Sequence, residues 1–243
     1  MKKAALFAIV FACCTMKVAA QGTIRVNCKG ANPTISDFVT AILAPTYGED
    51  GEEDESMNGI RYAWECYRKG KPQHEGVTFT LDQKNGFACY EYREVEEGVE
   101  FIARIEMCYW NEADQKHKLF AYNYMCYDNG RYSPGQYDGL TFYRYDNATK
   151  TMRYTSDPGV DAAQKATPPS VMVSFSLPRS GKDIVMTRWM SSGTKQQQAL
   201  KWNGHGFSAQ KPETETQAKN DDIDYSSGPE YNQDLRELVD EKD

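Results

Sequence analysis

The chain has 243 residues, of which 40% are hydrophobic and 12% aromatic, and its formal net charge at pH 7 is −7. An acidic surface without a clustered stripe of lysine and arginine disfavours nucleic acid and anionic membranes as partners. The length allows one large domain or two small ones.

The first residues have the pattern of a secretory signal peptide. Two lysines precede an apolar run over 4–14, and small residues lead up to Ala20. This order predicts a signal peptide over 1–20 and a periplasmic or secreted protein, with a lipoprotein anchored at Cys13 as the alternative. Removing three lysines with the peptide changes the net charge from −7 to −10. The apolar run is shorter than the roughly 20 residues that span a bilayer, so we expect no transmembrane segment.

Two short helices are expected before the strands begin. Thr34 or Ser36 can cap a helix that runs to about Ala44. Apolar residues at helical spacing predict a second helix over 58–67.

The rest of the globular region is predicted to be β-rich. Apolar and β-branched runs separated by turn residues predict eight strands, which are 77–81, 87–93, 101–110, 117–127, 140–146, 171–177, 183–189 and 196–202. The proline-containing stretch 155–170 is expected to be a loop that joins two sheets or subdomains. We therefore expect an α+β protein in which the two helices precede a largely antiparallel, eight-stranded β-sandwich or partly open barrel.

The domain boundaries follow from a change in composition. A single β-rich domain is expected over 21–207. Residues 208–243 are rich in aspartate and glutamate and poor in aliphatic side chains, so they are expected to form a disordered acidic tail.

The stretch 101–127 is the hairpin around which we expect the domain to be organised. Two aromatic and β-branched runs flank the polar connection NEADQK and should pair antiparallel about a turn centred on Ala113 and Asp114. One face is then nearly all apolar and must be buried. This face holds Phe101, Ala103, Ile105, Met107 and Tyr109, level with Cys126, Tyr124, Tyr122, Phe120 and Lys118.

The opposite face of this hairpin mixes charged, amide and imidazole groups with apolar ones. Exposed aromatic and guanidinium groups are common in binding sites, so this face is the candidate surface for a ligand or partner. The candidate binding residues are Arg104, Glu106, Trp110, His117 and Asn123. The alternative is an ordinary, partly solvated sheet face.

Export permits disulfides, and five cysteines remain after the predicted cleavage. Cys108 and Cys126 are expected on opposite faces of the hairpin, so we do not pair them. Cys66 with Cys89 is the first pairing to test, and five buried thiols are the alternative.

One segment matches a metal-binding motif. Asp54, Ser56, Asn58 and Glu65 fit ligand positions of a calcium-binding EF-hand loop, although an acidic loop before a helix explains the same residues. The three histidines are far apart in the sequence, which disfavours zinc. No catalytic motif is present, so we assign no catalytic residue and expect no cofactor.

The segments IEMCYW (105–110), GLTFY (139–143) and LKWNG (200–204), with VAAQ at the predicted cleavage site, carry a family resemblance. They are similar to secreted β-rich proteins of unassigned function from Bacteroidota-type bacteria. This resemblance implies an extracytoplasmic bacterial setting and assigns no site residues.

These observations predict an exported, non-enzymatic module that binds a protein or a glycan. A hydrolase of polysaccharide or peptidoglycan is the alternative, and it would need a deep cleft with convergent carboxylates of perturbed pKa. An inhibitor of another enzyme is a third hypothesis.

Overall fold

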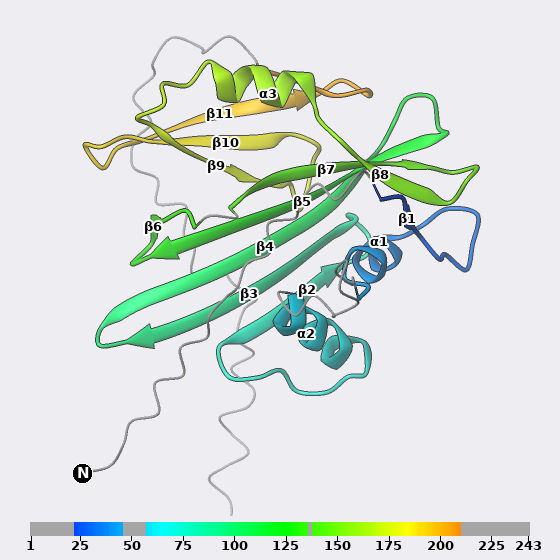
Figure 1. The fold of residues 1–243 in the computed structure, drawn as a ribbon, viewed down its shortest axis with the longest axis horizontal. Helices are drawn as coiled ribbons and strands as arrows, with labels where there is room; N and C mark the ends of the chain where they lie inside the picture. The colour runs from blue at the N-terminus through cyan, green and yellow to red at the C-terminus, as the bar shows by residue number, and fades with distance from the viewer. Residues whose placement is uncertain (1–21, 46–56, 136–137, 210–243) are drawn as a thin grey trace, which may run out of the picture. The chain divides into compact units, whose positions relative to one another are not determined.

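The structure, a computed structural model, describes residues 22–45, 57–135 and 138–209 (Figure 1). The predicted signal peptide and all but the first two residues of the predicted tail lie outside these ranges. The helices are α1 (Ile35–Ile42), α2 (Asn58–Arg68) and α3 (Pro158–Lys165). The strands are β1 (Ile24–Arg25), β2 (Val77–Asp82), β3 (Phe87–Glu96), β4 (Val99–Asn111), β5 (His117–Asp128), β6 (Arg131–Tyr132), β7 (Gly139–Asp146), β8 (Thr151–Thr155), β9 (Met172–Ser176), β10 (Ile184–Trp189), β11 (Lys195–Trp202) and β12 (Phe207–Ala209).

Two antiparallel sheets make up most of the described chain. The larger has eight strands in the order β1-β8-β7-β5-β4-β3-β2, with β6 paired to the end of β5, and the smaller has the order β12-β11-β10-β9. The α+β class with mainly antiparallel strands is confirmed. The expected eight-stranded sandwich or barrel is not matched, because twelve strands divide unequally between the sheets and a third helix is present. No helix among the described residues could span a membrane.

Helix α1 has Thr34 as its N-cap, which is one of the two predicted caps. The carboxylate of Asp37 accepts hydrogen bonds from the Thr34 backbone N–H at 2.7 Å and from its hydroxyl at 2.9 Å, which fixes the first turn. The buried ring of Phe38 stacks on Phe120 at 5.2 Å and meets Tyr145 edge-on at 5.3 Å. Helices α1 and α2 thus cover one face of the larger sheet (Figure 1).

Strands β4 and β5 form the predicted hairpin with a pairing shifted by two residues. Phe101 lies opposite Asp128 instead of Cys126. The turn is centred one residue later than expected, in a five-residue connection over 112–116 where Gln115 has a φ of +57°. A shift of two positions leaves every side chain on its predicted face, so the apolar face is buried beneath the helices as expected.

The smaller sheet and α3 cover the opposite face of the hairpin. Their buried side chains form one cluster with those of the larger sheet. The larger sheet contributes Phe87, Cys108, Trp110, Leu119, Ala121 and Phe142, the smaller sheet contributes Phe175, Leu177, Ile184, Met186, Leu200 and Phe207, and α3 contributes Val160 and Ala163. The face of the hairpin that was expected to be accessible to a ligand or partly solvated is therefore largely buried.

Helix α3 occupies the stretch 155–170, where we expected only a loop. The buried carboxylate of Asp157 accepts from the backbone N–H groups of Gly159 at 2.9 Å and Val160 at 3.0 Å, while Pro158 fills the first helical position. The second carboxylate oxygen of Asp157 accepts a hydrogen bond from the backbone N–H of Phe207 at 3.0 Å. One side chain therefore joins α3 to β12, which extends two residues into the predicted tail.

Replacing Gly159 by alanine tests this junction. Alanine normally stabilises a helical position by about 1 kcal/mol relative to glycine. Here a Cβ would lie 1.7 Å from the carbonyl oxygen of Phe207, so β12 would have to move. We expect G159A to lower the free energy of unfolding by about 2 kcal/mol, measured by urea denaturation. The control G139A adds a Cβ with nothing within 4 Å and should lose no stability. A G159A protein as stable as the wild type would contradict the tight contact.

Candidate functional site

The five residues predicted to form a binding surface do not share an accessible one. Glu106, Trp110 and Asn123 are buried, with 7%, 5% and 1% of their surface exposed. Arg104 and His117 stay partly exposed. However, Arg104 lies opposite Met125, eight positions from His117 along β5, which corresponds to roughly 27 Å. The prediction that these five residues share one accessible surface is therefore wrong. A binding role for the partly exposed Arg104 and His117 stays a prediction.

The three buried residues instead hold the smaller sheet on the larger one. Glu106 Oε2 accepts from the backbone N–H of Leu177 at 2.7 Å, and Asn123 Nδ2 donates to the carbonyl oxygen of Phe175 at 2.7 Å. Trp110 Nε1 donates to the carbonyl oxygen of Lys182 at 2.8 Å. Buried polar groups need such partners, so these side chains serve the seam between the sheets.

The predicted pairing of Cys66 with Cys89 is not formed, since both are free cysteines. Cys66 lies on α2, which packs on the sheet face that carries Tyr90. Cys89 directly precedes Tyr90 in β3, so its side chain points to the other face of the sheet. Burial raises the pKa of the Cys89 thiol to about 12, so this residue is not a thiolate nucleophile near neutral pH.

The predicted calcium-binding loop is also wrong in the part of it that the structure describes. Asn58 and Glu65 both belong to α2, although they would be positions 5 and 12 of an extended loop wrapped around an ion. The carboxylate of Glu65 pairs with Arg68 at 3.0 Å and with Lys69 at 2.9 Å. The other two predicted ligands, Asp54 and Ser56, lie outside the described residues.

Charged groups cluster around the loop between β4 and β5. Arg144 on β7 donates from Nε to Glu112 Oε1 at 2.8 Å and from Nη2 to Glu112 Oε2 at 2.6 Å. His117 Nδ1 lies 2.6 Å from Asp114 Oδ2. Hydrogen bonds from the His117 ring and from the backbone of Lys116 and His117 lower the pKa of Asp114 to about 2. Asp114 is therefore ionised throughout the physiological range.

Glu112, Asp114 and His117 also have the residue types of a metal site, and one possible ligand atom from each lies within 4.8 Å of the other two. Arg144, however, already engages both oxygens of Glu112 as a bidentate partner. The guanidinium brings the positive charge that a metal ion would bring. The cluster is best described as an ion-pair network that fixes the β4–β5 loop.

A shallow, open depression of about 600 Å³ lies beside this network. We call it the β4–β5 cleft. It is lined by Tyr109 and Asn111 of β4, Gln115 of the loop, His117 and Lys118 of β5, and Asn32 and Pro33 before α1. Lys118 Nζ donates to Asn111 Oδ1 and lies 5.1 Å from the centre of the Tyr109 ring. Amide, phenol, imidazole and ammonium groups thus converge in one place.

Only His117 of this cleft was among the predicted binding residues. The sequence did contain a signal, because Lys118 is the one cation on the apolar face of the hairpin. The expected register placed it opposite Tyr109, whereas it pairs with Asn111 at the mouth of the loop. Asn32 and Pro33 reach the cleft only through the packing of α1, which local sequence patterns do not reveal.

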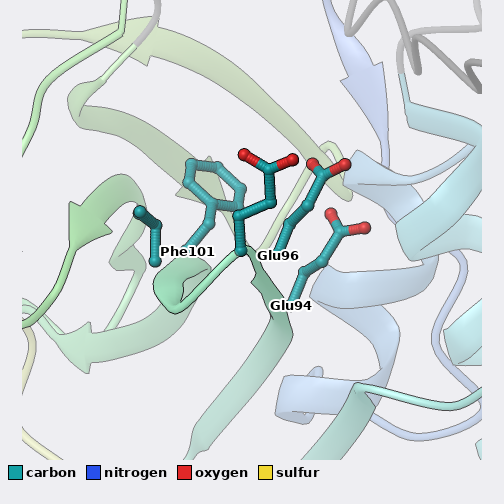
Figure 2. A pocket seen from close by; sticks show the side chains of 5 residues that line it. Glu94, Glu96 and Phe101 are labelled. Atoms are coloured by element: carbon teal, nitrogen blue, oxygen red, sulfur yellow. The ribbon is translucent and has the colours of Figure 1, made fainter.

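A smaller pocket of about 380 Å³ lies at the tip of the β3–β4 hairpin. Glu94 and Glu96 extend beside Phe101 there (Figure 2), and Glu97 and Val99 complete the lining. Exposed carboxylates commonly gather on the turns of an acidic protein without a ligand. We therefore place the candidate site in the β4–β5 cleft.

Comparison of the chain with protein-family models, with curated proteins and with solved structures finds no match in any of the three. The function therefore has to be inferred from the chemistry of the cleft itself.

Stability should depend on the protonation of Glu106. Burial raises the pKa of this carboxyl from 4.5 to about 7. The folded state then binds the proton more tightly than the unfolded state, so this stabilisation is full below pH 4.5 and is lost as the pH rises through 7. We expect the unfolding free energy of the wild type, relative to that of Glu106→Gln, to fall by about 3 kcal/mol between pH 4.5 and pH 8. Glutamine keeps an acceptor for Leu177. Denaturation at several pH values measures the difference, and a constant difference would contradict the raised pKa.

Removing Arg144 tests the ion-pair network. Arg144→Ala leaves the buried carboxylate of Glu112 without its cation, so we expect a loss of about 2 kcal/mol in the free energy of unfolding. The double variant Glu112→Gln with Arg144→Ala should recover part of it, because a neutral amide is less costly to bury. Arg153→Ala on the neighbouring strand is the matched control, since Arg153 is exposed. Equal losses in the single and double variants would show that no buried charge was left behind.

Proposed function

We propose that the protein is an exported, non-enzymatic binding module whose β4–β5 cleft takes a glycan. The observation that carries the proposal is the lining of the cleft by three amide side chains, Asn32, Asn111 and Gln115. An amide both donates and accepts hydrogen bonds, as does each hydroxyl group of a sugar. A rigid loop, fixed by the neighbouring ion pairs, supports the required precision.

The distribution of exposed apolar groups favours a glycan over a protein as the ligand. Large exposed hydrophobic side chains in the described ranges occur at three separate places: Tyr62 and Tyr67 on α2, Val95 and Val99 at the β3–β4 tip, and Tyr154 on β8. Stable protein interfaces usually centre on a contiguous cluster of buried anchors and cover about 800 Å² on each partner. Two pairs and one single residue at separate places do not make such a centre.

The carboxyl groups argue against the hydrolase alternative. Glycoside hydrolysis generally needs a carboxylic acid of raised pKa beside a second carboxylate. Asp114, next to the cleft, has a pKa of about 2 and cannot act as a general acid. Burial raises the pKa of Glu106 and of Asp138, but Glu106 is buried at the seam between the sheets, and Asp138 accepts from the N–H of Cys126, toward the end of β5 opposite the cleft.

The proposed setting is outside the cytoplasm. The predicted signal peptide over 1–20 and the resemblance to secreted Bacteroidota-type proteins both support export. An exported module would meet polysaccharides and peptidoglycan directly.

A glycan array probed with the mature chain, followed by calorimetry on the hits, tests the proposal. We expect Asn32→Ala and Gln115→Asn each to weaken binding about fivefold, since each removes or displaces one hydrogen-bonding group. Asparagine is chosen at position 115 because it tolerates the positive φ found there. Gln196→Ala, an exposed amide on β11, is the control and should bind as the wild type does.

Absence of binding to every glycan, or unchanged affinity in both cleft variants, would overturn the proposed function. Release of shortened oligosaccharides during incubation, detected by mass spectrometry, would support the hydrolase instead.

A further inference from the structure

Lys118 is the one buried cation among the residues that the structure describes. Only 6% of the surface of Lys118 is accessible to solvent. Its ammonium group contacts the neutral oxygen of Asn111 and the face of the Tyr109 ring. Within the described ranges no carboxylate forms an ion pair with it. A buried positive charge is thus held by neutral groups alone.

Three other cations of the sheets have carboxylate partners although they are more accessible than Lys118. Arg104 Nε donates to Glu91 at 2.9 Å, and Lys201 Nζ donates to Asp183 at 2.6 Å. Arg144 holds both oxygens of Glu112. Lys118, the most buried of these cations, has no such partner among the described residues, and the part-buried Arg188 of β10 likewise donates only to neutral groups, Thr167 and Gln198.

Packing alone does not explain a lysine at this position. Burying an unpaired ammonium is unfavourable, and here burial lowers the pKa of Lys118. A methionine would fill the same space against Tyr109 without that cost. The charge instead lines the β4–β5 cleft, where a ligand can reach it.

We infer that Lys118 is an anion-recognition residue and that the ligand of the β4–β5 cleft carries an acidic group, as the carboxylate of a uronic acid does. This inference rests on the proposed glycan function and names the class of glycan. An ammonium donates a strong, charge-assisted hydrogen bond to a carboxylate. The amides of Asn32, Asn111 and Gln115 can donate to its remaining lone pairs.

The carboxylates around the cleft already have donors of their own. Arg144 holds both oxygens of Glu112, and Asp37 of α1 accepts from the N–H and the hydroxyl of Thr34. Asp114 lies 2.6 Å from His117 Nδ1 and 3.8 Å from Arg144 Nη2. Its Oδ1 accepts from the backbone N–H groups of Lys116 and His117. Its charge is therefore directed into the loop.

Calorimetry with the full mature chain tests the inference through four probes. They are an oligosaccharide that contains glucuronic acid, the same oligosaccharide with its carboxyl groups reduced to alcohols, free glucuronate, and inorganic phosphate. We expect the acidic oligosaccharide to bind about tenfold more tightly than its reduced counterpart, as one charge-assisted hydrogen bond implies.

Lys118→Met should abolish this preference and leave the affinity for the reduced oligosaccharide within about twofold, because only the charge is lost. Its melting temperature should be at least that of the wild type, which shows that the variant folds. Lys84→Met removes an exposed lysine outside the cleft and should keep the full preference.

The outcomes separate this inference from the proposed function. Equal affinity for the acidic and reduced oligosaccharides in the wild type overturns the inference and leaves glycan binding intact. A preference that survives in Lys118→Met overturns the role of Lys118. Phosphate or free glucuronate that binds as tightly as the acidic oligosaccharide, and is lost in Lys118→Met, supports anion recognition and overturns the glycan as its source.

Discussion

The antiparallel pairing of β4 with β5 determines where almost every other described element can lie. Alternate side chains of this hairpin pack against the helices on one face and against the smaller sheet on the other. A slip of β4 by one residue against β5 would turn Met107 toward the smaller sheet and would bring Glu106 into the helix-covered core. The same register places Asn111 beside Lys118, and so it also builds the cleft.

Local patterns predicted the sides of the hairpin and eight of the twelve strands in the described ranges, because alternation with period two is visible in the sequence, but they missed β1, β6, β8 and β12. They were insufficient for the polar face. Glu106 and Asn123 looked like solvated residues, but their hydrogen-bond partners are backbone groups of Leu177 and Phe175, more than 50 residues later. A side chain that pairs with a distant N–H group has the same local sequence as one that pairs with water.

The stretch that contains α3 shows a different reason for error. Three prolines suggested a loop, yet proline is favourable at the first position of a helix, and aspartate before it is a good cap. The pair Asp157 and Pro158 was therefore a readable signal. For the cleft, Lys118 was readable in a similar way, as a cation out of place, whereas the contribution of Asn32 required the tertiary packing of α1.

The double use of the Asp157 carboxylate has a consequence for the order of folding. One carboxylate oxygen of Asp157 accepts from the first turn of α3, and the other accepts from Phe207 of β12, which is 50 residues after Asp157. A chain still emerging from the ribosome can pair β2 to β8 and seat the first two helices, but it cannot complete the surroundings of α3 until Phe207 is available. Closing that long loop delays the smaller sheet, so the seam over the hairpin would be the last part of the fold to become protected.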